Sequence, residues 1–277
     1  MDFLISVFKI LDLQMTRPEP YGWFHIMWLA LTVVGTVLLC KWVGKGKGEE
    51  KGALVRRIVL VTAVICALLE LYKQIVFTFE LNDGTLTGDY QWYAFPFQFC
   101  SMPMLAGVLT GFFKRGRVHR GLMAFLASYS IFAGFIVMLM PTTVFVGTIG
   151  VNIETMFCHA SMIPVGVMLL HSGYVAPDHS AVFKAMPVFG TAVALACIMN
   201  EIAHASGLLA TEEFNMFYVS PYCAPSLPVY SSVQAVVPYP LSLIIYVVGF
   251  SLAAYIMVLI YMVCHRIAKR VKAKRTV

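Results

Sequence analysis

Apolar residues fill long runs of this chain, and short polar segments separate the runs. Each run approaches the roughly 20 residues that a helix needs to cross the hydrocarbon core of a bilayer. The pattern therefore predicts an all-α protein, a polytopic membrane bundle of about seven transmembrane helices. The expected spans cover residues 24–43, 56–79, 93–113, 119–140, 153–172, 182–205 and 241–264.

The composition supports this class of protein. The 277 residues are 60% hydrophobic and 12% charged, whereas soluble domains carry roughly 25% charged residues. Because no internal repeat and no soluble segment of domain size interrupts the runs, we expect a single integral membrane domain over residues 1–277. Within it, residues 1–22 are expected to form a short interfacial segment and residues 265–277 a basic cytoplasmic tail.

The basic residues predict the orientation of the bundle. Lys and Arg concentrate in alternate loops and in the tail, as the positive-inside rule requires of cytoplasmic segments. We therefore expect the N-terminus outside and the C-terminus in the cytoplasm. This placement also explains the formal net charge of +6, so no nucleic-acid partner is expected. The basic segments are residues 41–57, 114–120 and 266–275, and the loops at 80–92, 141–152 and 206–240 hold no Lys or Arg.

The seven cysteines follow no recognisable disulfide or ligand pattern. Most lie inside apolar runs, where a cysteine usually acts as a small buried hydrophobe, and no CxxC pair occurs. We therefore expect neither a disulfide framework nor a metal site. Nothing in the sequence indicates a cofactor.

The third expected span contains an unusual stretch, Phe95 to Pro103. It carries an amide, a thiol and a hydroxyl within four positions, at Gln98, Cys100 and Ser101. Polar side chains are costly in hydrocarbon and usually face a bundle interior. Two prolines in the same stretch restrict where a helix can begin or bend. We interpret the stretch as one wall of a site.

Four other expected spans carry polar residues at a similar depth, in the half of the membrane nearer the outer face. The inner halves are almost free of such residues, and random surface polarity would not sort in this way. The set comprises His25 in the first span, Glu70, Tyr72, Lys73 and Gln74 in the second, Asn152, Glu154, Thr155 and His159 in the fifth, and Asn200, Glu201 and His204 in the sixth.

Helical spacing places several of these residues on shared faces. Glu70 lies with Lys73 and Thr155 with His159. Each set also has a structural interpretation. Glu70 and Lys73 would form an ion pair, His25 would be an interfacial residue, and the polar residues of the sixth span would mark a helix end.

Cys100 and His159 permit nucleophilic catalysis. Burial in apolar surroundings disfavours the thiolate, so a cysteine nucleophile needs a base within hydrogen-bond reach, and histidine is the usual one. Both residues lie about two turns into inward-running helices, so their depths match. We predict a dyad that opens to the outer leaflet, where the available acyl donors are lipids. Candidate supporting groups are Glu154, Asn200 and Glu201 to orient the imidazole, and Ser101, Gln98 or Asn200 to stabilise an oxyanion.

The segment between the last two spans, residues 206–240, is long for a connection in a tight bundle. It contains Asn215-Met216-Phe217-Tyr218 and several prolines. Loops of this kind often form a lid or a re-entrant cap. A rigid surface connector is the alternative.

Several of these motifs resemble those of a known family. The run Phe-Gln-Phe-Cys100-Ser-Met resembles the Cys-Ser motif of bacterial YwaF-type membrane proteins, which are relatives of the animal transmembrane protein 164 family. The resemblance covers about residues 20–265 and rests on the order and spacing of its motifs. The other matching elements are Trp23-Phe24-His25, Glu70 with Lys73, Cys158-His159, Asn215-Met216-Phe217-Tyr218 and Pro238-Tyr239-Pro240.

The resemblance implies a helical fold shared with the androgen-induced gene 1 type hydrolases. It also implies a cysteine nucleophile at Cys100, a histidine at His159, acyl transfer into ether phospholipids and a bacterial cell membrane as location. Two departures occur: Cys158-His159 stands where the bacterial branch often has His-His, and Pro-Tyr-Pro stands where the family has Pro-Trp-Pro. The lipid substrate of the animal proteins does not carry over to a chain of bacterial type.

Three functions are consistent with the sequence. In the first, Cys100 takes an acyl group from a phospholipid and passes it to a lysophospholipid or to water, with membrane lipids as the partners. In the second, the intramembrane Glu, Lys and His residues serve a small-solute or proton-coupled transporter. The third is a non-catalytic receptor or assembly factor. The expected substrate-binding or supporting residues are His25, Glu70, Lys73, Gln98, Ser101, Thr155, Asn200, Glu201, His204 and Asn215.

Overall fold

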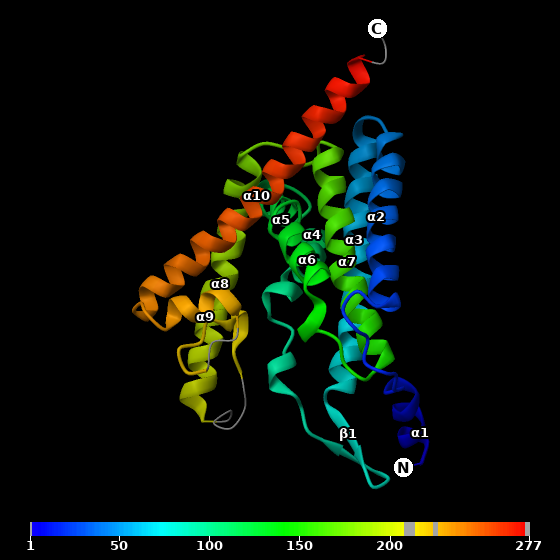
Figure 1. Cartoon of the computed structure of the whole chain (residues 1–277), viewed down its shortest axis with the longest axis vertical. Helices are drawn as coiled ribbons and strands as arrows, with labels where there is room; N and C mark the ends of the chain where they lie inside the picture. Colours follow the sequence, from blue (N-terminus) through cyan, green and yellow to red (C-terminus); the bar gives the residue numbers. More distant parts are fainter. Residues whose placement is uncertain (1, 208–213, 224–226, 275–277) are drawn as a thin grey trace.

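The computed structural model describes residues 2–207, 214–223 and 227–274. This part of the chain forms an α-helical bundle with a small β-hairpin at one end (Figure 1). Six of its helical stretches are long and apolar enough to cross a membrane, so the chain is an integral membrane protein. These stretches are α2 (Trp23–Gly44), α3 (Gly48–Val76), Gly116–Leu139, α7 (Ile149–His171), α8 (Ser180–Ser206) and the apolar part of α10 (Tyr239–Lys274).

The third expected span is shorter than the sequence predicted. A single helix over residues 93–113 was expected, and the apolar helix that forms covers Phe99–Phe112. At 1.5 Å per residue this helix is about 21 Å long, less than the ~30 Å of a hydrocarbon core. The elements in this region are the 3₁₀ turn η1 (Trp92–Ala94), the 3₁₀ turn η2 (Phe99–Ser101) and helix α4 (Met102–Phe112).

Prolines explain why this helix begins late. Phe95 precedes Pro96 and has ψ 132°, because a residue before proline avoids the helical region. Pro103 lies in the first turn of α4, where its missing N–H removes no helical hydrogen bond. The chain therefore stays irregular up to Gln98.

The fourth expected span, residues 119–140, is broken into two helices, α5 (Gly116–Leu126) and α6 (Tyr129–Leu139). The break falls at Ser128, whose backbone leaves the helical region at φ −134° and ψ −77°. The Ser128 hydroxyl donates to the carbonyl oxygen of Ala124 at 2.7 Å. Such a bond competes with the regular ladder and bends helices. No proline marks this position, so the hydrophobic pattern could not reveal it.

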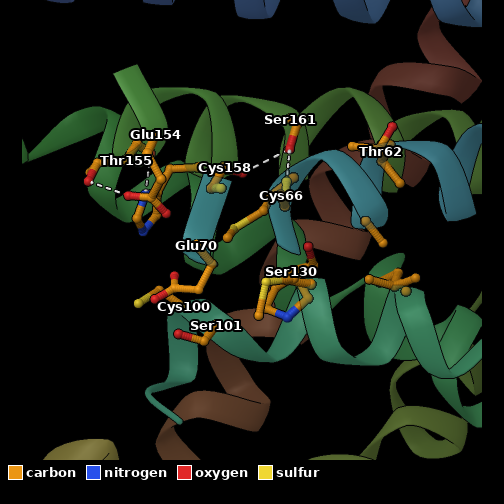
Figure 2. A pocket seen from close by; sticks show the side chains of 18 of the residues that line it. Thr62, Cys66, Glu70, Cys100, Ser101, Ser130, Glu154, Thr155, Cys158 and Ser161 are labelled. Atoms are coloured by element: carbon orange, nitrogen blue, oxygen red, sulfur yellow. Dashed lines mark hydrogen bonds between the residues drawn. The ribbon is translucent and has the colours of Figure 1, made fainter. Parts of the chain in front are cut away.

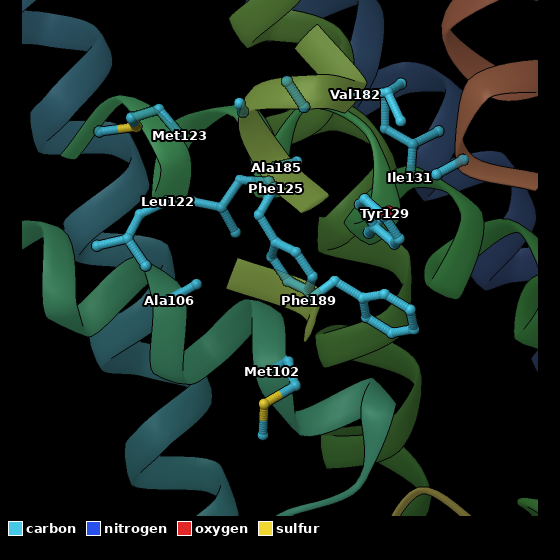
Figure 3. Close-up of a cluster of buried hydrophobic side chains, with 14 of the residues drawn as sticks. Met102, Ala106, Leu122, Met123, Phe125, Tyr129, Ile131, Val182, Ala185 and Phe189 are labelled. Atoms are coloured by element: carbon cyan, nitrogen blue, oxygen red, sulfur yellow. The ribbon is translucent and has the colours of Figure 1, made fainter. Parts of the chain in front are cut away.

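The broken span lies at the centre of the bundle. Its apolar window is 72% buried, compared with 11% for α2. Aromatic rings join it to its neighbours (Figure 3): Phe125 stacks on Tyr129 with ring centroids 5.4 Å apart, and Tyr129 stacks on Phe189 of α8 at 4.6 Å. The Tyr129 hydroxyl also lies 2.7 Å from Ser251 Oγ in α10.

Residues 79–88 form a hairpin that the sequence analysis placed in a loop. Its strands are β1 (Phe79–Asn82) and β2 (Thr85–Gly88). The turn residues Asp83 and Gly84 have φ of 48° and 78°, and two-residue hairpin turns of type I′ require positive φ at both positions. The Asp-Gly dipeptide is the feature of the sequence that could have predicted this hairpin.

Helix α1 (Asp2–Leu11) lies beyond the first span at the same end of the bundle as the hairpin (Figure 1). Phe3 and Ile10 are 78% and 75% exposed, while Phe8 is buried. The helix therefore presents an apolar outer face, as an interfacial segment would.

Part of the long segment at residues 206–240 folds into the bundle. Met216, Phe217 and Val219 are fully buried, so residues 214–220 form a re-entrant plug rather than a surface connector. The segment also contains the 3₁₀ turn η4 (Met216–Tyr218) and helix α9 (Pro228–Gln234). Its residues 208–213 and 224–226 lie outside the described part of the chain.

Candidate functional site

A cavity of about 60 Å³ lies between α3, the start of α4, α6 and α7. Figure 2 shows its side chains converging from these elements. By this measure a water molecule needs ~10–15 Å³, so the cavity holds a few waters, whereas pockets for drug-sized ligands usually measure ~300 Å³ or more. A lipid could enter only if the cavity widens. The polar residues that line it are Thr62, Cys66, Glu70, Lys73, Cys100, Ser101, Ser130, Glu154, Thr155, Cys158, His159 and Ser161.

His159 lines this cavity, and one of its ring nitrogens has no hydrogen-bond partner. Its Nδ1 atom lies 2.7 Å from the carbonyl oxygen of Thr155, one turn earlier in α7. A carbonyl oxygen can only accept, so Nδ1 carries the proton in this contact. The Nε2 atom is buried and has no hydrogen-bond partner. In the neutral ring Nε2 is then an acceptor, as a general base requires.

A glycine of α6 lets that helix approach the His159 turn. A Cβ atom at Gly134 would lie 2.6 Å from the carbonyl oxygen of His159 and 2.9 Å from Cβ of Met162. No real Cβ makes such contacts, so the close packing of α6 on α7 depends on the missing side chain.

Cys100 and Ser101 reach the cavity from the 3₁₀ turn η2, just before α4. The irregular segment that precedes them determines their position, because it delays the helix until Phe99. Cys100 and His159 thus line the same cavity. Ser101 lines it as well.

Three charged side chains form an ionic group at the cavity wall. Lys73 Nζ lies 2.7 Å from Glu70 Oε2 and 3.5 Å from Glu154 Oε1. The first contact is the predicted pair within α3, and the second links α3 to α7. Gln74 Nε2 donates to Glu70 Oε1 at 2.7 Å, and the Thr155 hydroxyl donates to Glu154 at 3.0 Å. One ammonium group therefore serves two buried carboxylates.

The imidazole is oriented by a different group from those expected. The contact to its Nδ1 atom comes from the backbone of Thr155, and within the described residues the ring makes no hydrogen bond to Glu154, Asn200 or Glu201. Thr155 thus contributes through its carbonyl group, which any residue type could supply.

His25 lies outside the cavity. Its Nδ1 atom accepts from the backbone N–H of Tyr21 at 2.9 Å, and its Nε2 atom donates to the carbonyl oxygen of Met138 at 2.9 Å. The buried ring therefore joins the start of α2 to the end of α6. Both nitrogens are occupied, so this histidine has a structural role.

The amides of Gln98 and Asn200 hold the plug at residues 214–220. Gln98 donates to the carbonyl oxygen of Asn215 at 3.0 Å and accepts from the N–H of Phe217 at 2.8 Å. Asn200 donates to the carbonyl oxygen of Met216 at 3.1 Å and accepts from its N–H at 2.8 Å. Each amide uses its oxygen and one N–H on the backbone of the plug, and neither residue is among those that line the cavity.

The plug also contains a strained backbone. Phe217 and Tyr218 have φ of 58° and 56°, in the left-handed region that costs non-glycine residues about 1 kcal/mol or more each. Asn215 closes the turn by accepting from the N–H of Ser220 at 2.9 Å. The three amides therefore hold a conformation that the plug would not adopt alone.

Glu201 and His204 lie at the exposed end of α8, away from the cavity. The Tyr222 hydroxyl donates to Glu201 Oε2 at 2.8 Å, and the His204 ring stacks on Tyr222 with centroids 3.5 Å apart. The sequence predicted a similar depth for these two residues and the cavity residues, but Glu201 and His204 do not line the cavity.

Sequence reasoning missed the other cavity residues, above all Cys66, Cys158 and Ser161. Cys66 lies four residues before Glu70, so helical spacing on α3 was a usable signal. The sequence held no such signal for Ser130 on α6, because the break at Ser128 sets the direction of this helix. In the described residues, no group of three or more His, Cys, Asp or Glu side chains could hold a metal ion.

Comparison with known protein families gave one match. A family model described as the TMEM164 family matches residues 20–263, which is most of the chain. No curated protein and no solved structure matches this chain.

Proposed function

The chain belongs to the TMEM164 family, and on this premise we propose that it is a membrane-embedded acyltransferase. In this proposal Cys100 and His159 act on the acyl chains of phospholipids or lysophospholipids. The observation that carries the proposal is the buried, unpartnered Nε2 atom of His159 in a cavity that Cys100 also lines.

The proposed reaction has two halves. His159 Nε2 takes the thiol proton of Cys100, and the thiolate sulfur attacks the carbonyl carbon of a lipid ester. The ester C–O bond then breaks, and His159 returns the proton to the lysolipid oxygen that leaves. In the second half, the acceptor is the hydroxyl of a lysolipid or a water molecule, and His159 takes its proton. The acceptor oxygen attacks the thioester carbon, the C–S bond breaks, and Cys100 is released.

The surrounding residues suit this sequence of steps. The Thr155 carbonyl keeps the proton on Nδ1 and leaves Nε2 as the base. Lys73 supplies positive charge at the cavity wall, and the Ser101 hydroxyl is the available donor for an oxyanion. Gln98, Asn200 and Asn215 support the site indirectly, by holding the plug that covers the bundle.

We propose that α4, with the irregular segment before it, completes a seventh crossing of the membrane. Non-helical backbone is tolerated at membrane depth where protein buries it, and Gln98 ties this segment to the plug. Figure 1 shows α1 and the last turns of α10 at opposite ends of the bundle, which suits an odd number of crossings. The N-terminus would lie outside, the basic tail in the cytoplasm, and the protein in a bacterial cell membrane.

An acyl-transfer assay tests the proposed enzyme. Purified protein in lipid vesicles is given a phospholipid with an isotope-labelled acyl chain and an unlabelled lysophospholipid. Wild type and the control Cys264→Ala, which alters an exposed cysteine of α10, should transfer label. Cys100→Ser and His159→Ala should lower transfer at least tenfold, and Cys100 should carry a hydroxylamine-sensitive acyl group. Equal turnover by wild type and both variants would end the proposal.

A transporter is the second candidate, and the ionic group of Lys73, Glu70 and Glu154 favours it. Charged residues inside a bundle often mark ion or proton paths. The near absence of polar residues from the inner halves of the spans argues against a continuous path. Uptake of a small solute or of protons by proteoliposomes, lost in Glu70→Gln, would support transport over acyl transfer.

A further inference from the structure

The cavity contains two thiols that the proposed acyl transfer does not use. Cys66 comes from α3 and Cys158 from α7, and both are free. Helices α3 and α7 pack against each other, and both thiols line the cavity between them. The Ser161 hydroxyl joins the pair, since it lies 3.8 Å from Cys66 Sγ and donates to the carbonyl oxygen of Cys158 at 2.9 Å. Figure 2 shows both thiols and this serine on one wall of the cavity.

The interface that carries the two thiols is held on one side by the ion pair between Lys73 of α3 and Glu154 of α7. Glu154 lies one helical turn before Cys158, and Lys73 lies about two turns after Cys66. The ion pair therefore holds α3 and α7 together close to the two thiols. A disulfide needs an S–S bond of about 2.05 Å between sulfurs on neighbouring backbones, and Cys66 and Cys158 lie on neighbouring helices that line one cavity.

The cavity also provides a base and room for a small oxidant. His159 lines the same cavity as Cys66 and Cys158, and its Nε2 atom is buried without a hydrogen-bond partner. The cavity of about 60 Å³ can admit a molecule slightly larger than water, such as hydrogen peroxide.

We propose that Cys66 and Cys158 are a redox-active pair that hydrogen peroxide oxidises to a disulfide between α3 and α7. His159 takes the Cys66 proton, and the thiolate attacks one peroxide oxygen. An S–O bond forms, the O–O bond breaks, and the leaving hydroxide takes the proton back as water. The Cys158 sulfur then attacks the sulfenic sulfur, the S–O bond breaks, and a second water leaves with the Cys158 proton. Two thiols are oxidised and one peroxide is reduced.

The disulfide would change the cavity around His159. It would tie α3 to α7 covalently and remove the motion by which the cavity could widen for a lipid. Oxidation should therefore lower acyl transfer, and a thiol reductant should restore it. This consequence rests on the proposed acyl transfer, whereas formation of the disulfide does not.

Peptide mapping of the full chain in lipid nanodiscs tests the pair. Reduced wild-type protein is treated with hydrogen peroxide, free thiols are alkylated, and the digest is analysed by mass spectrometry. We expect a peptide that links Cys66 to Cys158, lighter by two hydrogen atoms than the two thiol peptides and lost after reduction. Cys100→Ala and Cys264→Ala should retain the linked peptide, and His159→Gln should slow its formation.

Two results would overturn the proposal. In one, Cys66 and Cys158 of wild-type protein are both recovered as alkylated thiols under conditions that oxidise the exposed Cys264. In the other, the linked peptide joins Cys100 to one of them. Both are read on wild-type protein, so they do not depend on the folding of a variant. They also need no acyl transfer, so failure of the acyltransferase assay leaves the disulfide result interpretable.

Discussion

Nearly every buried polar atom of a folded protein finds a hydrogen-bond partner, yet the Nε2 atom of His159 has none. The opposite ring nitrogen is committed to the Thr155 carbonyl, so the ring cannot turn to relieve this without losing that bond. Leaving such a group unsatisfied costs about 1–3 kcal/mol. That cost is understandable where the nitrogen awaits a proton from a thiol or a substrate.

At the same scale, Lys73 should matter more for stability than either carboxylate that it contacts. Lys73→Met would leave Glu70 and Glu154 buried without a cation, and breaking a buried pair in this way costs about 3–5 kcal/mol. Glu154→Gln keeps the Lys73–Glu70 pair, so we expect a loss of about 1 kcal/mol. Thermal unfolding in detergent compares the two variants. Equal losses would mean that Lys73 does not hold the group together.

The helices are positioned by small residues and amides as well as by apolar surface. Gly134 admits the His159 turn of α7, and Asn200 fixes both backbone groups of Met216. Neither feature is a property of one helix. Each depends on which segment lies opposite, so the hydrophobic pattern that located the helices could not predict them.

Replacing Gly134 with alanine should therefore destabilise the bundle. The new Cβ atom would meet the backbone oxygen of His159 at 2.6 Å, and overpacking of this kind typically costs about 1–3 kcal/mol. Gly190→Ala is the matched control, because a Cβ atom there meets nothing within 4 Å. We expect a lower unfolding temperature for Gly134→Ala alone. Similar curves for both variants would show that α6 can shift without cost.

Asn200→Ala should release the plug at residues 214–220. The variant loses both contacts to Met216 and leaves the buried Met216 N–H unsatisfied, at about 1–3 kcal/mol, whereas the Met216 carbonyl oxygen still accepts from the N–H of Val219. Hydrogen exchange should accelerate at the Met216 amide, whose present acceptor is Asn200. His204→Ala, at the exposed end of the same helix, should leave that exchange rate unchanged. Unchanged protection in Asn200→Ala would mean that Gln98 and apolar packing suffice.

For the whole molecule, the charge distribution and the arrangement of the helices give one orientation. Basic residues gather in the segment 41–57 and in the tail, and the hairpin at residues 79–88 carries none. Figure 1 shows the hairpin at the opposite end of the bundle from the α2–α3 connection. Under the positive-inside rule this arrangement supports the proposed orientation, in which the hairpin lies outside the cell.

Labelling of single added cysteines in intact cells checks this orientation. Thr85→Cys, in the hairpin, should react with a membrane-impermeant maleimide from outside. Lys45→Cys, in the α2–α3 connection, should react only after the cells are opened. The parent protein without an added cysteine measures the background. If Lys45→Cys labels from outside, or both positions label from the same side, the proposed topology is wrong.

The sequence by itself determined the class of the protein, and it predicted the depth of the polar residues. Hydrophobic length and loop charge are local properties, so they can be read from the chain. Helical position likewise placed Cys100 and His159 at matching depths. The same reasoning predicted matching depths for His25, Glu201 and His204, and yet they make their contacts elsewhere.

Only the tertiary structure decided which of these residues meet. The direction in which a helical side chain points depends on where the helix begins, where it breaks and which helix packs beside it. Pro96 delays the helix that carries Cys100, the break at Ser128 turns Ser130 toward the cavity, and Gly134 brings α6 against His159. The presence of Cys66 and Cys158 in one cavity also follows from that packing, because the assembled bundle brings together residues that are distant in sequence.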